Sequence, residues 1–290
     1  MLKDTFRLLR PHQWTKNGIL LAGLIFSGSA GDWPKTVTVF LATGLFCLIS
    51  SAVYVINDII DADADRHHPQ KAARPIAAGR IKPAAAVVLA IIMAAAALVG
   101  AYLLHLGLFI AACAYLALNL FYSAILKHVV IIDVMTIAVG FVLRALAGAM
   151  VIEVRFSGWL LVTSFLLALL LGLGKRRHEL LFLDETGAEH RRILARYSDR
   201  YLDQLIGIVT PAVLVCYLLY VISPEVSVRL GTEYLWLTIP FVMYGIFRYL
   251  YLVYQQNQGG SPARLLLTDR PLLLTISLWL LAALFLIYYL

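Results

Sequence analysis

Charged residues are scarce in this sequence. They make up 14% of the 290 residues, whereas 61% are hydrophobic and the mean hydropathy is +0.84. A soluble domain is roughly 45–50% apolar and about 25% charged. The shortage of charge therefore excludes a large soluble domain and a disordered regulator, and it indicates a protein whose solvent is lipid.

Cysteines are equally few. Cys47, Cys113 and Cys216 are an odd number, stand within apolar runs and form no CxxC pair. This pattern excludes a disulfide scaffold and provides no sulfur-based metal site. We expect the three side chains to act as small buried hydrophobic groups.

Long apolar segments fill most of the chain. A membrane-crossing helix needs about 20 apolar residues, and nine segments are candidates, the first of them short. They are Asn17–Gly31, Thr36–Asn57, Pro83–Leu104, Leu106–Leu126, Val134–Ile152, Phe156–Gly174, Gln204–Pro224, Tyr234–Tyr254 and Pro271–Leu290. The predicted fold class is all-α, a polytopic membrane protein of nine transmembrane helices. The first segment resembles a signal peptide, but Pro11 and Trp14 in its long basic lead favour a retained segment.

Positive charge is distributed unevenly along the chain. Most of the 24 Lys and Arg residues precede the first segment or lie at the ends of the second, fourth, sixth and eighth, and the opposite loops hold only Lys35, Arg155 and Arg229. Since Lys and Arg are enriched in cytoplasmic loops, we predict an inner-membrane protein with its N-terminus in the cytoplasm and its C-terminus outside. The net charge of +7 suggests contact with anionic membrane lipid or phosphorylated substrates, and no nucleic-acid partner is expected.

Four aspartates crowd the cytoplasmic end of the second segment, directly after Asn57. In a continued helix, Asp58, Asp61 and Asp65 share one face, whereas Asp63 points away. Carboxylates this close repel one another, and Mg²⁺ is usually held by one or two carboxylates plus substrate phosphates. We therefore predict Asp58, Asp61 and Asp65 as metal ligands; the alternative is a solvated acidic loop.

A basic run, Arg66–Arg80, follows the aspartates. Lys71 and Arg74 are candidate diphosphate ligands, because Arg offers a planar fork of donors and Lys a point charge. Topological bias alone explains these residues equally well. For His67 and His68 we expect hydrogen-bonding or interfacial roles, since His favours softer metals than Mg²⁺.

Two other cytoplasmic segments carry bases without matching acids. Arg10–Asn17 leads into the first span and places Arg10 and Lys16 at headgroup depth. Gly174–Glu179 ends the sixth span with Lys175 and Arg176 as candidate phosphate ligands. Contact with lipid phosphate, or topological bias, is the alternative for both segments.

The fifth span contains Asp133 and Arg144. They are 11 residues apart, about three helical turns, so they lie on one face but roughly 16 Å apart along the axis. A charge within a membrane helix faces the bundle interior and is a functional hypothesis by default. Tyr122 and Lys127 end the preceding span on the cytoplasmic side. We expect one central cavity open to the cytoplasm, although a packing hydrogen bond is an alternative role for Arg144.

Together these motifs resemble the UbiA superfamily of intramembrane prenyltransferases, over nearly the whole chain and as one transmembrane domain, 1–290. In that family the aspartates bind Mg²⁺ and a diphosphate leaving group. Most members have a second aspartate-rich motif at the end of the sixth helix. Here that position is the basic segment Gly174–Glu179, which disfavours the usual prenylation of an aromatic acceptor.

Four segments are similar to one branch of the superfamily, the decaprenyl-phosphate phosphoribosyltransferases: Arg10–Asn17, Asn57–Gly79, Asp133–Arg144 and Gly174–Arg176. The resemblance implies transfer of 5-phosphoribose from 5-phosphoribosyl 1-diphosphate to a polyprenyl phosphate, with Mg²⁺ as cofactor. It implies catalytic roles for Asp58, Asp61, Asp65 and Lys175. The substrate-binding residues it implies are Arg10, Lys16, Asn57, Lys71, Arg74, Tyr122, Lys127, Asp133, Arg144 and Arg176.

Two alternatives stay open. A related enzyme could move a prenyl group from a prenyl diphosphate to an aromatic or other acceptor. A transporter would belong to a different class, but transporters often contain inverted repeats, and the second half does not repeat Asn57–Asp65. The sequence does not decide between a monomer and a homo-oligomer, and it does not give the prenyl chain length.

Overall fold

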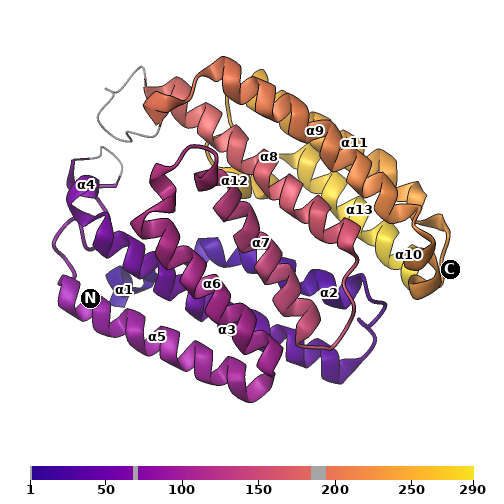
Figure 1. Ribbon diagram of the computed structural model, residues 1–290, viewed down its shortest axis with the longest axis horizontal. Helices are drawn as coiled ribbons and strands as arrows, with labels where there is room; N and C mark the ends of the chain where they lie inside the picture. Colours follow the sequence, from indigo (N-terminus) through magenta and orange to yellow (C-terminus); the bar gives the residue numbers. More distant parts are fainter. Residues whose placement is uncertain (1, 68–70, 184–193) are drawn as a thin grey trace. The chain divides into compact units, whose positions relative to one another are not determined.

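The computed structural model describes residues 2–67, 71–183 and 194–290, and within these ranges the chain forms only helices and turns (Figure 1). In this described part of the chain, eight helical segments are long and apolar enough to cross a membrane. They correspond to α3 (Trp33–Ile60), α5 (Pro83–Leu104), α6 (Leu106–Ala124), α7 (Ile132–Met150), most of α8 (Gly158–Leu183), α9 (Asp199–Val221), α11 (Ile239–Tyr254) and α13 (Arg270–Tyr288). The prediction of an all-helical, multi-pass membrane protein is confirmed.

The first predicted span, Asn17–Gly31, is not among these eight. Its residues are divided between the 3₁₀ helix η1 (Pro11–Leu20) and the short helix α2 (Leu21–Ile25). Gly28 follows at a φ of 73°, a conformation that glycine adopts at little cost and that does not continue a helix. The count of nine spans therefore stays a prediction.

Shorter elements connect the long helices. They are α1 (Leu2–Leu9), α4 (Ala62–Arg66), η2 (Leu126–His128), η3 (Leu194–Arg196), α10 (Pro224–Leu230), η4 (Tyr234–Thr238) and α12 (Pro262–Thr268). Prolines stand at the start of several helices, as Pro240 does in α11. This is the position where the missing N–H of proline costs nothing.

The chain divides into two compact units. The first comprises Met1–Leu24, Asp32–Lys127 and Leu143–Val154. In it α3 packs against α5, α6 and η1. Gly148 lies so close to η1 that a Cβ there would stand 2.0 Å from the carbonyl oxygen of Leu20. Only glycine permits this approach of two backbones.

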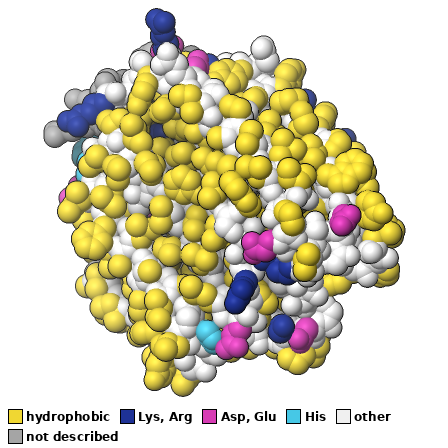
Figure 2. Space-filling view, turned by 45° about the vertical axis from the view of Figure 1, so that its right-hand side comes forward, with side chains coloured by type: hydrophobic (Ala, Val, Ile, Leu, Met, Phe, Trp, Pro, Cys, Tyr) yellow, Lys and Arg dark blue, Asp and Glu magenta, His cyan; other side chains and the backbone are white. Residues whose placement is uncertain are grey.

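Helix α5 shows why this unit suits a membrane. Its small residues Ala86, Ala90 and Ala97 are buried against neighbours, whereas Ile91 and Ile92 are 62% and 59% exposed. Small residues let membrane helices approach closely, and a large exposed apolar face is typical of a surface that contacts lipid or a partner. Hydrophobic side chains likewise dominate the surface in Figure 2.

The second unit comprises Ile25–Gly31, His128–Val142 and Arg155–Leu290. Here α8 packs along α9, and α11 along α13. Its main core gathers apolar side chains of α8, α9 and α11, including Leu170, Leu202 and Leu252, and Tyr197 joins them from the segment after η3.

The three cysteines are free and half-buried rather than fully buried.

Candidate active site

The predicted aspartate motif lies where α3 gives way to α4. The backbone bonds from Asp61 N to Asn57 O, 2.9 Å, and from Asp65 N to Asp61 O, 2.8 Å, keep the helical spacing across this junction. The helical backbone on which Asp58, Asp61 and Asp65 were predicted to share one face therefore continues across the junction. Asp63 is 90% exposed and pairs with Arg66 at 2.6 Å, as its outward orientation predicted.

Arg74 joins two of the aspartates. Its Nη1 donates to Asp58 Oδ1 at 3.1 Å and also to Asp65 Oδ2. Both carboxylates are buried, whereas the Arg74 side chain is 24% exposed. Two carboxylates thus converge on a single positively charged nitrogen that solvent can reach.

Asp61 faces different partners. Its Oδ1 accepts a bond from Lys127 Nζ at 2.6 Å, and its Oδ2 accepts one from Asn57 Nδ2 at 3.0 Å. Asn57 is held in turn by Ser123, which donates to Asn57 Oδ1 at 3.1 Å. Asn57 and Lys127, both predicted site residues, therefore orient this carboxylate.

Arg10 also belongs with the aspartates. Its guanidinium donates to Asp58 Oδ1 and lies 5.2 Å from the ring centroid of Tyr54. Burial, together with the positive charges of Arg144 and Arg10, lowers the pKa of Lys16 to about 8. The first unit therefore contains a group of cations, and one of them, Lys16, titrates near neutrality.

Arg144 lies inside the first unit in a polar network. It is 5% exposed, its Nε donates to Asn17 Oδ1 at 2.8 Å, and its Nη2 donates to the Tyr115 hydroxyl at 2.6 Å. Ser50 completes the network by donating to Asn17 Oδ1 at 3.3 Å. The guanidinium also lies 4.6 Å from the Tyr115 ring centroid. The expectation that Arg144 faces the bundle interior is confirmed.

A second cluster of charges lies in the second unit. Arg176 Nε donates to Asp133 Oδ2 at 2.7 Å, and the side chains of Arg176 and Asp133 are 4% and 0% exposed. Arg176 also donates to Glu179, and Lys175 Nζ lies 3.6 Å from the same carboxylate. Arg176 is therefore enclosed by carboxylates, whereas Lys175, at 44% exposure, is reachable from solvent.

The remaining predicted residues have less defined surroundings. Lys71 is half-buried in the turn after α4, and Tyr122 is half-buried near the end of α6. His67 is exposed, and its Nδ1 lies 2.9 Å from Asp63 O. His68 lies outside the described residues.

Sequence reasoning missed several members of these clusters. Tyr115 and Ser50 bind the Arg144 network from α6 and α3, and Tyr197 donates to Asp133 Oδ1 at 2.9 Å. The usable signal was the buried arginine itself: a charge inside a membrane protein needs polar partners. Tyr115 and Ser50 are polar residues within apolar spans, so they could have been proposed.

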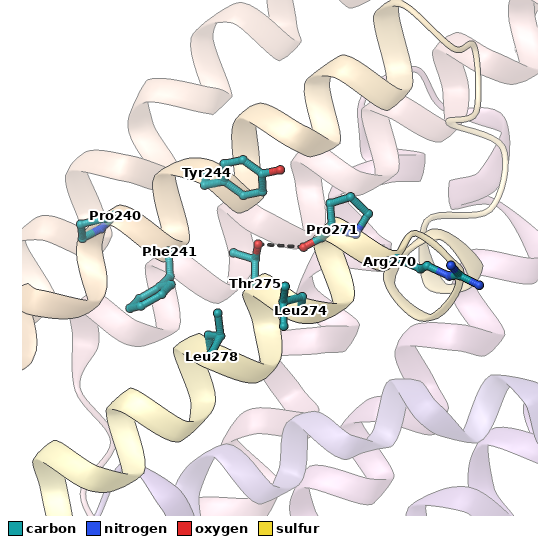
Figure 3. Close-up of a pocket in the computed structure, with 8 residues that line it drawn as sticks. All are labelled: Pro240, Phe241, Tyr244, Arg270, Pro271, Leu274, Thr275 and Leu278. Carbon is teal, nitrogen blue, oxygen red and sulfur yellow. Dashed lines mark hydrogen bonds between the residues drawn. The ribbon is translucent and has the colours of Figure 1, made fainter.

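An apolar groove of about 530 Å³ lies between α11 and α13 (Figure 3). Phe241, Tyr244 and Leu278 line it, and the Thr275 hydroxyl is already bonded to Pro271 O at 2.8 Å. Arg270, at its edge, is directed away from the groove in Figure 3. The groove suits a hydrocarbon chain, and none of the predicted site residues lines it.

The aspartates fit a magnesium ion of the substrate-bridging kind. Within residues 2–67, 71–183 and 194–290, no three His, Cys, Asp or Glu side chains form a ready-made ligand set. Mg²⁺ needs only one or two carboxylates when substrate phosphates supply other ligands. Asp58 and Asp65, which already share one cationic partner, are such a pair.

Comparison with known proteins identifies the family of this chain. Residues 18–269 match the UbiA prenyltransferase family. The chain belongs to that family. It is also 33% identical over 288 residues to the decaprenyl-phosphate phosphoribosyltransferase of Mycolicibacterium smegmatis, covering 96% of this chain and 91% of that protein.

A second relative and a solved structure are also similar to this chain. The decaprenyl-phosphate phosphoribosyltransferase of Corynebacterium glutamicum is 33% identical, with 94% of this chain and 83% of that protein covered. A UbiA homolog from Archaeoglobus fulgidus, solved with GPP and Mg²⁺, superposes with a TM-score of 0.72 at 18% identity, covering 99% of this chain and 100% of that one. The UbiA family fold is thereby established for this membrane protein.

Proposed function

We propose that this UbiA-family protein transfers 5-phosphoribose from 5-phosphoribosyl 1-diphosphate to a polyprenyl phosphate of the decaprenyl type and releases diphosphate. The observation that carries the proposal is the number of cations around the aspartates. Arg10, Arg74 and Lys127 bind them directly. Burial, with the charges of Arg144 and Arg10, lowers the pKa of Lys16. A prenyl diphosphate donor carries one diphosphate, whereas this reaction brings together a diphosphate, a 5-phosphate and a lipid phosphate.

The donor side of the site uses Asp58, Asp65 and Arg74. The two carboxylates would hold Mg²⁺, which neutralises the departing diphosphate and acts as a Lewis acid. Arg74, partly exposed, is free to exchange a carboxylate for a phosphate, to which its planar fork is suited. Lys71 and Lys175 are further donor ligands in this proposal.

The acceptor needs no general base. The second pKa of a phosphate monoester is about 6, so a lipid phosphate is already ionised near neutral pH. Lys16 would bind that phosphate at headgroup depth. Attack on the anomeric carbon passes through a transition state of oxocarbenium character, and catalysis consists of positioning and charge neutralisation.

Location follows from the distribution of Lys and Arg. We propose an inner-membrane protein with a cytoplasmic N-terminus, an external C-terminus and a site that faces the cytoplasm, where a water-soluble donor is available. We propose the whole chain, 1–290, as one transmembrane domain.

Purified protein incubated with Mg²⁺, labelled 5-phosphoribosyl 1-diphosphate and decaprenyl phosphate tests the reaction. The expected product is a labelled lipid, and its formation should require both substrates and the metal. The variant Asp58→Asn removes a proposed metal ligand. Its matched control is Asp63→Asn, which alters an exposed aspartate outside the proposed site. Labelling of an acceptor only from a prenyl diphosphate would contradict the proposal and favour ordinary prenyl transfer.

A further inference from the structure

The turn that precedes α7 contains an unusual backbone conformation. Ile131 has a φ of 71°, in the left-handed region. For a β-branched residue this conformation is an outlier, and such residues persist only when their surroundings hold them in place. Ile131 immediately precedes the first turn of α7, which contains Asp133.

Tyr197 supplies the contact that holds this turn. Its hydroxyl oxygen accepts the backbone N–H of Ile131 at 2.6 Å and donates its proton to Asp133 Oδ1 at 2.9 Å. A tyrosine hydroxyl has one proton and lone pairs, so the two bonds are compatible. Burial and the adjacent Asp133 carboxylate raise the pKa of Tyr197, so the hydroxyl keeps the proton that it donates.

The contacts continue from Asp133 to the basic end of α8. Asp133 Oδ2 accepts from Arg176 Nε at 2.7 Å, Arg176 donates to Glu179, and Lys175 Nζ lies 3.6 Å from Glu179. All of these residues belong to the second unit. The Asp133–Arg176 pair is buried and has fixed geometry, because any displacement leaves a buried charge without its partner. Glu179 and Lys175, at 23% and 44% exposure, continue the contacts toward solvent.

We propose that Tyr197 is a positioning residue for the donor: its hydroxyl holds the left-handed turn at Ile131, and through Asp133 and Arg176 it sets the place of Lys175. This inference rests on the proposed function, because it assigns Lys175 to donor phosphate. Without the hydroxyl, the Ile131 N–H loses its partner and the turn relaxes toward the right-handed region. Asp133 then moves with the first turn of α7.

The variant Tyr197→Phe removes one oxygen and keeps the ring, which stacks on Tyr201 at a centroid distance of 6.3 Å. We expect the KM for 5-phosphoribosyl 1-diphosphate to rise roughly tenfold, the effect of weakening one charge-assisted phosphate bond. The KM for decaprenyl phosphate and kcat should change much less. Tyr201→Phe is the matched control and should leave both KM values unchanged.

A second substitution separates positioning from general destabilisation. Glycine adopts positive φ readily, so Ile131→Gly added to Tyr197→Phe should restore most of the donor KM. Ile132→Gly, which lies in the helix, should not. An unchanged donor KM in Tyr197→Phe, or equal rescue by both glycines, would overturn the inference.

Failure of the proposed function is recognisable separately. If the wild-type protein uses only a prenyl diphosphate, the phosphoribosyl reaction is wrong, and the same KM comparison is then made with that donor. A rise in its KM, reversed by Ile131→Gly, would retain Tyr197 as a positioning residue. No rise would remove both conclusions.

Discussion

The two charge clusters of this protein are built from the same residue types but differ in how tightly they are closed. In the first unit Asp58 pairs with Arg10 and Arg74, whose side chains are 18% and 24% exposed. In the second unit Asp133 pairs with Arg176, and neither side chain exceeds 4% exposure. A partly exposed base can exchange one anion for another. A buried base cannot do so without leaving the carboxylate of its partner buried and uncompensated.

The comparison distinguishes residues that can bind a ligand from residues that stabilise the fold. Arg74 contacts two carboxylates through one nitrogen, so a phosphate and a metal ion can take over its contacts together. Arg176 is enclosed between Asp133 and Glu179. We therefore expect substitutions in the first cluster to affect turnover and substitutions in the second to affect stability first.

The largest effect is expected from Asp58→Asn. The change keeps the shape of the side chain but removes the charge that would hold Mg²⁺, and metal ions contribute several kcal/mol to such reactions. Turnover at low Mg²⁺ should fall by about 10³-fold, since each factor of ten corresponds to about 1.4 kcal/mol. The melting temperature in detergent should change little. Undiminished activity would show that this carboxylate does not bind the metal.

Asp133→Ala tests the closed cluster. Removing one partner of a buried pair costs about 3–5 kcal/mol, because the other charge stays buried and uncompensated. We expect a large fall in melting temperature, measured by thermal unfolding in detergent. The double variant Asp133→Leu, Arg176→Met should recover much of the stability, since apolar replacement of a whole pair is often neutral. An Asp133→Ala variant as stable as the wild type would show that the cluster is not closed in solution.

Arg74→Ala should weaken donor binding by roughly tenfold or more, because charge-assisted hydrogen bonds contribute about 1.5–3 kcal/mol. Calorimetric titration with 5-phosphoribosyl 1-diphosphate and Mg²⁺ measures the change. Arg66→Ala is the control, since Arg66 pairs with the exposed Asp63 and should not affect affinity. Equal affinities in the two variants would mean that the basic run serves topology alone.

The smallest effect concerns pH. The pKa of Lys16 is lowered to about 8, so the side chain is charged below that pH and neutral above it. If it binds lipid phosphate, kcat/KM for the acceptor should fall by up to about tenfold per pH unit above pH 8, because this ratio reports the free enzyme. Lys16→Arg keeps its charge and should remove this decline. A decline that persists in Lys16→Arg, or one seen only for the donor, would contradict the acceptor role.

Local sequence patterns correctly predicted much of this protein. The scarcity of charge and the length of the apolar runs predicted the eight helices that, among the described residues, are long and apolar enough to cross a membrane. The spacing of Asp58, Asp61 and Asp65 predicted one helical face; Asp58 and Asp65 do share a partner, Arg74, whereas Asp61 pairs with Lys127. The depth of Arg144 predicted an interior position. These inferences depend on the composition and periodicity of single segments, which a sequence shows directly.

Local sequence patterns could not predict which base pairs with which acid. The sequence predicted Lys71 and Arg74 as diphosphate ligands and did not indicate which base contacts which aspartate. Only the fold pairs Arg74 with Asp58 and Asp65, and Lys127 with Asp61. The sequence predicted both Lys175 and Arg176 as phosphate ligands, and only the packing shows that Arg176 is buried against Asp133. The first predicted span is also interrupted, because Pro11–Leu20 forms a 3₁₀ helix and only the short helix α2 follows before Gly28 at positive φ.

The sequence by itself determined that this is a helical membrane protein, which segments form its long apolar helices, and which acids and bases stand next to them in the chain. Tertiary structure alone decided which acid meets which base, which base stays reachable, and that Tyr197 holds the left-handed turn at Ile131. The physical reason is that hydrophobic periodicity is a property of neighbours in sequence. An ion pair or hydrogen bond depends instead on distances of about 3 Å between residues far apart in the chain, and only packing sets those distances.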